Sequence, residues 1–266
     1  MMTQSICHRV ALLNQIGIQL FEAQCYEDAI NRFKEALMLL SQTESKLESN
    51  IFAIAPLRES SQPMLMSHKI RRRQCRGSLK CNPTPFVFGG DNAHEHFDCW
   101  RAVASMAILY NMSLVHFTIE SYNQVELLLQ LILQTSPIFN KHEDEDFLWE
   151  NLMPDIAQIT VTTYLFLGCL TFMVKEEESD GDSGISESLS FLLLAIKVGQ
   201  TYLNGNCYLL GYVFVSMGQI LLHAKYFDEA ALALEEAHRI FQESELCFLN
   251  QVLNDNNIQN SAAAAA

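Results

Sequence analysis

The sequence predicts an all-α protein in which antiparallel helical hairpins stack into a short α-solenoid, with a long irregular insertion after the first hairpin. Three observations predict this fold. Apolar residues recur at intervals of three and four, the period of one helix face, along most of the 266 residues. The pattern of residues 10–41 returns, in spacing and side-chain size, in residues 211–242. Glycine and proline number only 11 and 6, too few for a turn-dense β-sandwich.

Composition and charge narrow the functional classes. With 49% apolar and 18% charged residues the chain can bury a large core, which excludes a disordered protein. The net charge of −14 repels phosphate backbones and anionic lipid surfaces, so we expect neither a nucleic-acid nor a membrane partner. The 8 cysteines are dispersed, unlike a disulfide framework, and the N-terminus lacks the pattern of a secretory signal. These features predict an intracellular, cytoplasmic protein.

The first hairpin is predicted in residues 10–43. Its first helix carries one apolar face, formed by Leu13, Ile16, Gly17 and Leu20. Its second helix carries another, formed by Ala29, Phe33 and Ala36. A glycine inside a helix costs about 1 kcal/mol relative to alanine, so Gly17 needs a packing reason. The close approach of two helices at small residues supplies that reason.

Three further segments carry the same pattern, and each is predicted as another hairpin: the match is good in residues 211–244, weaker in residues 106–139 and interrupted in residues 161–202. Their small positions are Ser113 in residues 106–139, Gly168 in residues 161–202, and Gly218, Ala230 and Ala237 in residues 211–244. The third of the four hairpins is lengthened by residues 175–185, which are acidic and rich in glycine and serine. We expect these residues to form a solvated loop inserted at the hairpin turn.

The small positions and their spacing resemble the tetratricopeptide repeat (TPR) family, whose unit is a helix–turn–helix of about 34 residues. The resemblance implies a single TPR-like helical domain over residues 1–247, with about four degenerate units and an irregular insertion at residues 44–100. It also implies a non-enzymatic scaffold whose concave groove, lined by the first helices, binds a peptide or a partner helix. Residues 248–266, a tail rich in asparagine and alanine, are predicted to be disordered.

The family's groove positions, carried over residue by residue, fall on neutral side chains. They are Asn14, Gln15, Ile18, Tyr110, Asn111, Leu114, Phe166, Tyr212, Ser216 and Gln219. None is Lys or Arg, the charge-assisted donors that a desolvated carboxylate needs, so we expect no binding of a chaperone's C-terminal carboxylate. Such a groove suits an apolar or mixed peptide, or residues 44–100 of the chain itself folded back into it.

The insertion contains two features with competing interpretations. A basic cluster at residues 69–80 holds six of the 17 Lys and Arg residues, and we interpret it as a loop lying against the acidic surface. The alternatives are a nuclear-import signal, a phosphate-binding patch or a basophilic kinase site at Ser78. The candidate metal ligands of an alternative metal-binding or enzymatic site are Cys75, Cys81, His94, His96 and Cys99. Their spacing departs from that of common zinc sites, so we expect no metal and no cofactor.

The rest of the chain offers no catalytic motif. A Gly-rich phosphate loop, a His-Glu-x-x-His helix and a Gly-x-Ser-x-Gly elbow are all absent, so we expect a protein that is not an enzyme. The stretch from Ile156 to Val174 has no charged residue and nearly reaches the ~20 residues of a membrane span. We interpret it as a buried helix, because it carries the Leu–Gly pair of a repeat. Self-association, as a homo-oligomer, is an alternative to a separate partner.

Overall fold

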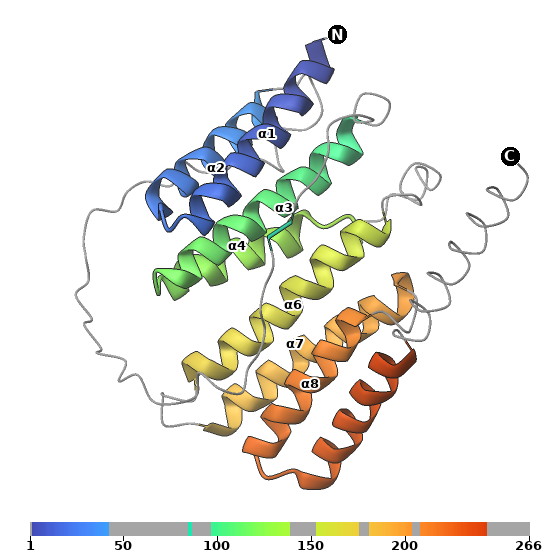
Figure 1. Ribbon diagram of the computed structural model, residues 1–266. Helices are drawn as coiled ribbons and strands as arrows, with labels where there is room; N and C mark the ends of the chain where they lie inside the picture. Colours follow the sequence, from blue (N-terminus) through green and yellow to red (C-terminus); the bar gives the residue numbers. More distant parts are fainter. Residues whose placement is uncertain are drawn as a thin grey trace, which may run out of the picture.

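The computed structural model describes residues 2–42, 85–86, 97–138, 153–175, 181–203 and 208–243 (Figure 1). Over these ranges the chain is helical and contains no strand, which confirms the all-α prediction. The labelled helices are α1 (Met2–Glu22), α2 (Tyr26–Ser41), α3 (Phe97–Thr118), α4 (Tyr122–Thr135), α6 (Met153–Lys175), α7 (Gly181–Tyr202) and α8 (Tyr208–His223). Residues 227–243 form a further helix after α8.

The helices pack in sequential pairs. Helix α1 packs against α2, α3 against α4, and α6 against α7, while α8 contacts the 227–243 helix through Leu221 and Ala230. Successive pairs also touch, because α2 contacts α3, α4 contacts α6, and α7 contacts α8. The first helices of neighbouring pairs contact one another as well, α1 with α3, α3 with α6, and α6 with α8. In Figure 1 the pairs follow one another from the blue to the red end of the chain.

The first helices begin earlier than the repeat units predict. Helices α1, α3 and α6 begin well before the predicted units at residues 10–43, 106–139 and 161–202. The added turns bury apolar side chains, among them Cys7 on α1 and Ile156 on α6, each 0% exposed. The predicted insertion at residues 44–100 is correspondingly shorter, since α3 begins at Phe97.

The predicted loop at residues 175–185 is also shorter than expected. Helix α6 includes Lys175, and α7 already begins at Gly181. Gly184 is buried and Ile185 packs against the core, and this packing favours helix over the loop that the composition predicts. Only residues 176–180 separate the two helices, and they lie outside the described residues, as do the basic cluster at 69–80 and the tail at 248–266.

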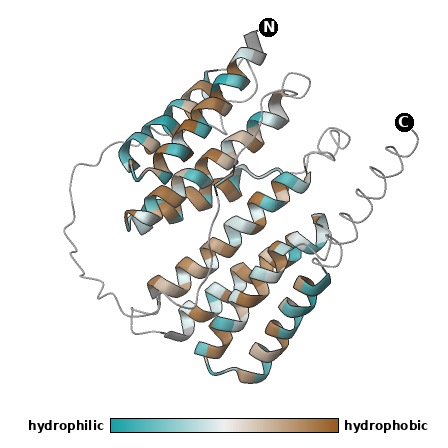
Figure 2. Ribbon diagram, in the orientation of Figure 1, coloured by the Kyte–Doolittle hydropathy of each residue, from teal (hydrophilic) through white to brown (hydrophobic). Residues whose placement is uncertain are grey.

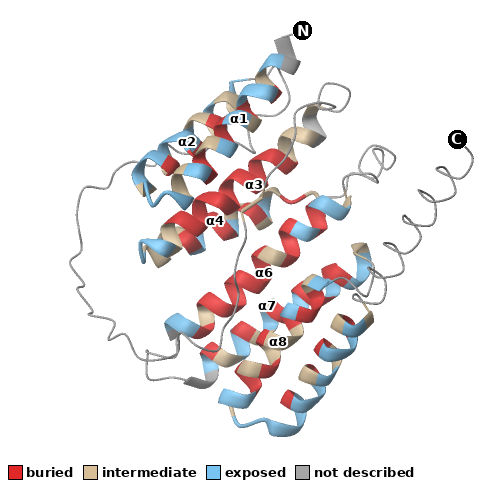
Figure 3. Ribbon diagram, viewed as in Figure 1, coloured by how far each residue is buried: buried red, intermediate tan, exposed pale blue. Residues whose placement is uncertain are grey.

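Helix α6 lies at the centre of the core. It contacts α3, α4, α7 and α8, and Figures 2 and 3 show it as a largely hydrophobic and buried helix. By length and composition, the stretch Met153–Val174 is the one candidate membrane span in the part of the chain that the structure describes. Within its apolar window 78% of the residues are buried by the protein itself, as in the core helix of a helical domain.

Three of the helix pairs are joined by the same tight turn. Its central residues have positive φ and are not glycine: Gln24 (63°), Glu120 (60°) and Lys225 (64°). The next amide donates to a carbonyl in the last turn of the preceding helix, as in Cys25 N–H to Leu20 O at 2.8 Å. The corresponding bonds are Ser121 to His116 and Tyr226 to Leu221, at 2.8 and 2.9 Å. This is a Schellman motif, in which the left-handed residue terminates the helix and turns the chain back.

Glycine at these three turn positions is expected to stabilise the protein. The left-handed conformation costs a residue with a Cβ roughly 1–2 kcal/mol, while glycine's larger unfolded-state entropy offsets part of the gain. We expect Gln24→Gly, Glu120→Gly and Lys225→Gly each to raise the free energy of unfolding by about 0.5–1 kcal/mol in urea titrations. Gln19→Gly, the same exchange at an exposed position inside α1, is the control and should lower it by about 1 kcal/mol. A lower free energy of unfolding in the three turn variants would contradict the strain that we assign to these left-handed residues.

Candidate functional site

Close contacts between the paired helices set how each first helix is rotated. A Cβ added to Gly17 would lie 2.5 Å from the ring of Phe33, which is 1% exposed. A Cβ on Gly218 would lie 2.7 Å from Leu234, and one on Gly168 would meet both Leu192 and a backbone carbonyl. All eight small positions are buried, namely Gly17, Ala29, Ala36, Ser113, Gly168, Gly218, Ala230 and Ala237. The second pair has Ser113 where the first pair has Gly17, and the Ser113 hydroxyl donates to the Tyr110 carbonyl at 2.7 Å.

The structure places most of the predicted groove residues inside the protein. Seven are buried: Asn14, Ile18, Tyr110, Asn111, Leu114, Phe166 and Ser216. Gln15 and Tyr212 are exposed, and Gln219 is half-buried. The seven buried residues therefore do not line an open groove. At the α1–α3 end, a short piece of the predicted insertion lies over these buried residues.

That piece is Pro85 and Phe86, the short teal segment beside α3 in Figure 1. The Phe86 N–H donates to Oδ1 of Asn111 at 2.8 Å, and Nδ2 of Asn111 donates back to the Phe86 carbonyl at 2.9 Å. Nδ2 of Asn14 donates to the same carbonyl at 3.0 Å. The Asn111 side chain thus pairs with both main-chain groups of one residue, as a neighbouring strand would.

The two asparagines also support each other. Nδ2 of Asn111 donates to Oδ1 of Asn14 at 2.9 Å, so both of its hydrogens are used. Asn14 is 0% exposed and Asn111 is 1% exposed. Buried amides that lose their partners are costly, about 1–3 kcal/mol for each unsatisfied group. This amide pair, joining α1 to α3, is therefore stabilised by the main-chain groups of Phe86.

A row of aromatic rings continues from the amide pair towards α6. The Phe86 ring meets Tyr110 edge-on at 5.0 Å between centroids, and Tyr110 meets Phe166 at 6.2 Å. Phe117 meets Phe166 edge-on at 5.1 Å. Such pairs contribute about 0.5–1.5 kcal/mol beyond the area that they bury. The site therefore contacts both the main-chain groups and the aromatic ring of Phe86.

Sequence reasoning named four members of this site and missed two. Asn14, Tyr110, Asn111 and Phe166 were predicted to line the face of the first helices, whereas Phe86 and Phe117 were not. A partial signal for Phe86 was present, because Pro-Phe-Val-Phe is one of the apolar stretches of the insertion. Phe117 lies at the place that Phe21 occupies in the first pair, and both pack on a tyrosine across the turn.

The alternative metal site falls mostly outside the described ranges. Cys75, Cys81, His94 and His96 are not described, and Cys99 lies in the first turn of α3. Among the residues that the structure describes, no three His, Cys, Asp or Glu side chains are grouped as metal ligands.

His116 marks the other end of the α3 face. It lies in the last turn of α3, and its buried Nδ1 has no hydrogen-bond partner in the described part of the chain. Burial, and secondarily the charge of Lys34, lowers the pKa of His116. The corresponding places in the first and last pairs hold Leu20 and Leu221.

Leucine at position 116 is expected to stabilise the protein and to change its pH dependence. Because the folded protein disfavours protonated His116, the unfolded chain binds more protons as the pH falls below about 6.5, and stability is lost there. We expect His116→Leu to add about 1 kcal/mol near neutral pH, where it removes an unpaired buried nitrogen. The advantage should grow as the pH is lowered from 6.5 to 5, measured by urea unfolding. If the unfolding free energies of the two proteins change in parallel with pH, the lowered pKa of His116 would be refuted.

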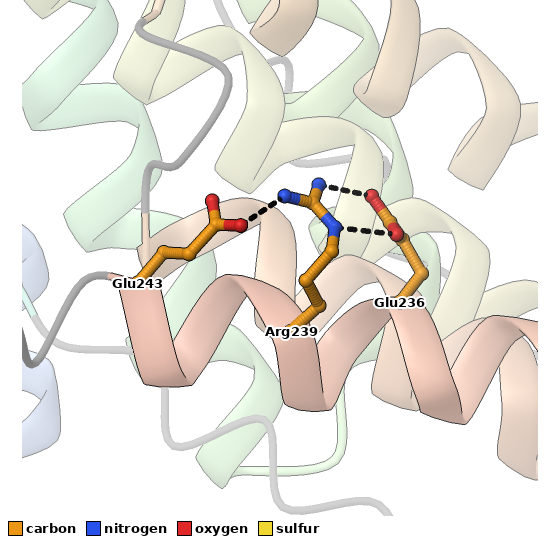
Figure 4. Close-up of polar contacts among 3 residues, drawn as sticks. All are labelled: Glu236, Arg239 and Glu243. Carbon is orange, nitrogen blue, oxygen red and sulfur yellow. Dashed lines mark hydrogen bonds and ion pairs between the residues drawn. The ribbon is translucent and has the colours of Figure 1, made fainter.

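Charged side chains form surface networks away from this site. On the 227–243 helix, Arg239 donates two hydrogen bonds to Glu236, at 2.9 and 2.5 Å, and one to Glu243 at 2.6 Å (Figure 4). The bonds from Arg239 lower the pKa of Glu236. On the first pair, Glu35 accepts from Arg9 on α1 and from Arg32 on α2. Exposed pairs of this kind contribute a few tenths of a kcal/mol each.

The amide pair and the aromatic row are thus the part of the described structure with the properties of a binding site. They are buried, neutral and drawn from α1, α3 and α6, and they are in contact with a segment distant in sequence. Comparison of the chain with known protein families, with curated proteins and with solved structures finds no match.

Proposed function

We propose that this protein is a non-enzymatic interaction scaffold, a TPR-like stack of helical hairpins that binds an extended polypeptide segment on the face of its first helices. The observation that carries the proposal is the pairing of the Asn111 side chain with both the N–H and the carbonyl of Phe86. Side-chain amides that mimic a strand edge recognise main chain irrespective of sequence, as in strand-addition modes of peptide binding.

Repetition within the chain supports the TPR-like stack. The same tight turn recurs at Gln24, Glu120 and Lys225, each at the same offset from Gly17, Ser113 and Gly218. First helices touch first helices along the chain, and each second helix touches the next first helix. Repeat proteins in which each unit contacts only its neighbours commonly present one face to an extended ligand.

The chemistry of the face supports a particular class of ligand. It offers amides and aromatic rings and has no Lys or Arg at the predicted groove positions, so we propose an internal, uncharged stretch of a protein partner as its ligand. A residue in contact with Asn111 must have a free N–H, which excludes proline at that position. The expectation that the face does not hold a chaperone's terminal carboxylate is part of the same proposal.

A peptide selection tests this function. A displayed library of random peptides would be selected on the Phe86→Ala protein and counter-selected on Phe86→Ala/Asn111→Ala, so that the two baits differ by one side-chain amide. We expect enriched peptides to share an aromatic residue and to lose binding to the second bait. Enrichment that ignores Asn111, or no enrichment at all, would contradict the proposed function.

A further inference from the structure

We propose that the binding face is self-occupied, with Phe86 acting as a resident ligand that an outside partner displaces by presenting an aromatic residue in an extended segment. This inference rests on the proposed function and adds two things to it. It names the residue class that the partner presents, and it states that the site is regulated by competition within the chain.

The contacts of Phe86 are those of a ligand more than those of a core residue. Its hydrogen bonds come from side chains 25 and 72 residues away, on two different helices. Core aromatics of this chain such as Phe33 and Tyr110 are 1% and 0% exposed, whereas Phe86 and its neighbour Pro85 are only half-buried. A half-buried residue held by amides and one ring contact can leave without opening the core beneath it.

The receiving side shows the opposite property. Asn14 and Asn111 are fully buried, and departure of Phe86 would leave the paired amides without their main-chain partners. An unsatisfied buried amide is unfavourable, so the vacant face favours any replacement with the same two main-chain groups. The aromatic preference follows from Tyr110, whose ring receives the Phe86 ring edge-on at 5.0 Å.

Competition within one chain has a predictable effect on affinity. A tethered segment acts at an effective concentration of about 1 mM for a short flexible linker, so it excludes weak outside ligands. The apparent dissociation constant of an outside ligand rises by the inverse of the fraction of vacant sites. Removing the resident side chain should therefore strengthen outside binding, even though Phe86→Ala adds no contact.

The test uses a fluorescent peptide with the sequence Asn-Pro-Thr-Pro-Phe-Val-Phe-Gly-Gly, that of residues 82–90, and the full-length protein. We expect Phe86→Ala to bind it at least about tenfold more tightly than the wild type does, by fluorescence anisotropy. Adding Asn111→Ala should abolish the gain, as should exchanging the first phenylalanine of the peptide for alanine. Phe227→Ala, a substitution of a 64% exposed phenylalanine away from the amide pair, is the matched control and should bind like the wild type.

Each outcome has a distinct meaning. Equal affinities for the wild type and Phe86→Ala would overturn self-occupancy while leaving the face as a binding site. No binding to Phe86→Ala, combined with successful selection of other peptides, would overturn the assigned ligand class alone. No binding combined with an empty selection would overturn the proposed function as well. If circular dichroism shows that Phe86→Ala loses helicity, Phe86→Leu takes its place in the test. Leucine keeps apolar volume at the position, so this variant should bind the peptide with an affinity between those of the wild type and Phe86→Ala.

Discussion

Replacing Tyr110 with alanine is expected to lower the free energy of unfolding by about 3–5 kcal/mol. The Tyr110 ring is 0% exposed and lies between Phe86 and Phe166, at centroid distances of 5.0 and 6.2 Å. Its removal leaves a cavity where α3 meets both α6 and the resident segment, and it deletes two ring contacts. Urea unfolding followed by circular dichroism would measure the loss as a lower midpoint with an unchanged slope.

Tyr212 is the matched control for this substitution. It was predicted to line the same face, but it is 41% exposed, and its ring contacts those of Tyr208 and Phe241 in the last pair. Tyr212→Ala is expected to cost less, about 1–2 kcal/mol, because 41% of its surface is already in water and the substitution leaves no enclosed cavity. Equal losses of unfolding free energy for Tyr110→Ala and Tyr212→Ala would contradict the burial of Tyr110 on the α3 face.

Replacing Gly17 with valine is expected to lower the free energy of unfolding by about 3 kcal/mol. The added Cβ would lie 2.5 Å from Phe33, a buried ring that cannot rotate away without disturbing α1 and α2. Valine also loses side-chain freedom inside a helix, so the small propensity gain over glycine does not offset the clash. Thermal and urea unfolding of the purified variant would both report the loss.

A second substitution at the same contact tests the cause. The last pair places Leu234 opposite Gly218, where the first pair places Phe33 opposite Gly17. Phe33→Leu alone should cost about 1 kcal/mol, but combined with Gly17→Val it should recover at least about 1 kcal/mol relative to the sum of the single losses. Strict additivity would mean that the two side chains do not compete for the same space.

The all-helical fold and the close helix contacts could be predicted because helix packing leaves a local pattern in the sequence. Gly17, Ala29 and Ala36 keep their spacing because two adjacent helices must approach closely, and both helices lie within one short segment. The same pattern recurs at Gly218, Ala230 and Ala237. The full lengths of the first helices left no comparable trace. From the sequence alone, the apolar residues before each unit are compatible with an insertion and with a helix. Their burial in the core shows that they belong to the helices.

Whether the candidate site is vacant or occupied could not be predicted in the same way. Asn14 and Asn111 were predicted on the face of the first helices, but both hydrogen-bond to Phe86, which belongs to another part of the chain. Contacts between segments so far apart follow no helical period, and neutral amides fit a vacant groove and an occupied one equally. The start of α7 at Gly181 shows the same limit, because the packing of Ile185 overrides a loop-like composition.

Hydrogen exchange of the Phe86 amide measures the central contact most directly, because that N–H donates to Oδ1 of Asn111. Resolved by NMR on the full-length protein, the amide should exchange at least about 100-fold more slowly than an unstructured peptide amide. In Asn111→Ala it should exchange near the unstructured rate, while amides within α6 remain slow. An unprotected Phe86 amide in the wild-type protein, or protection that survives Asn111→Ala, would contradict the account.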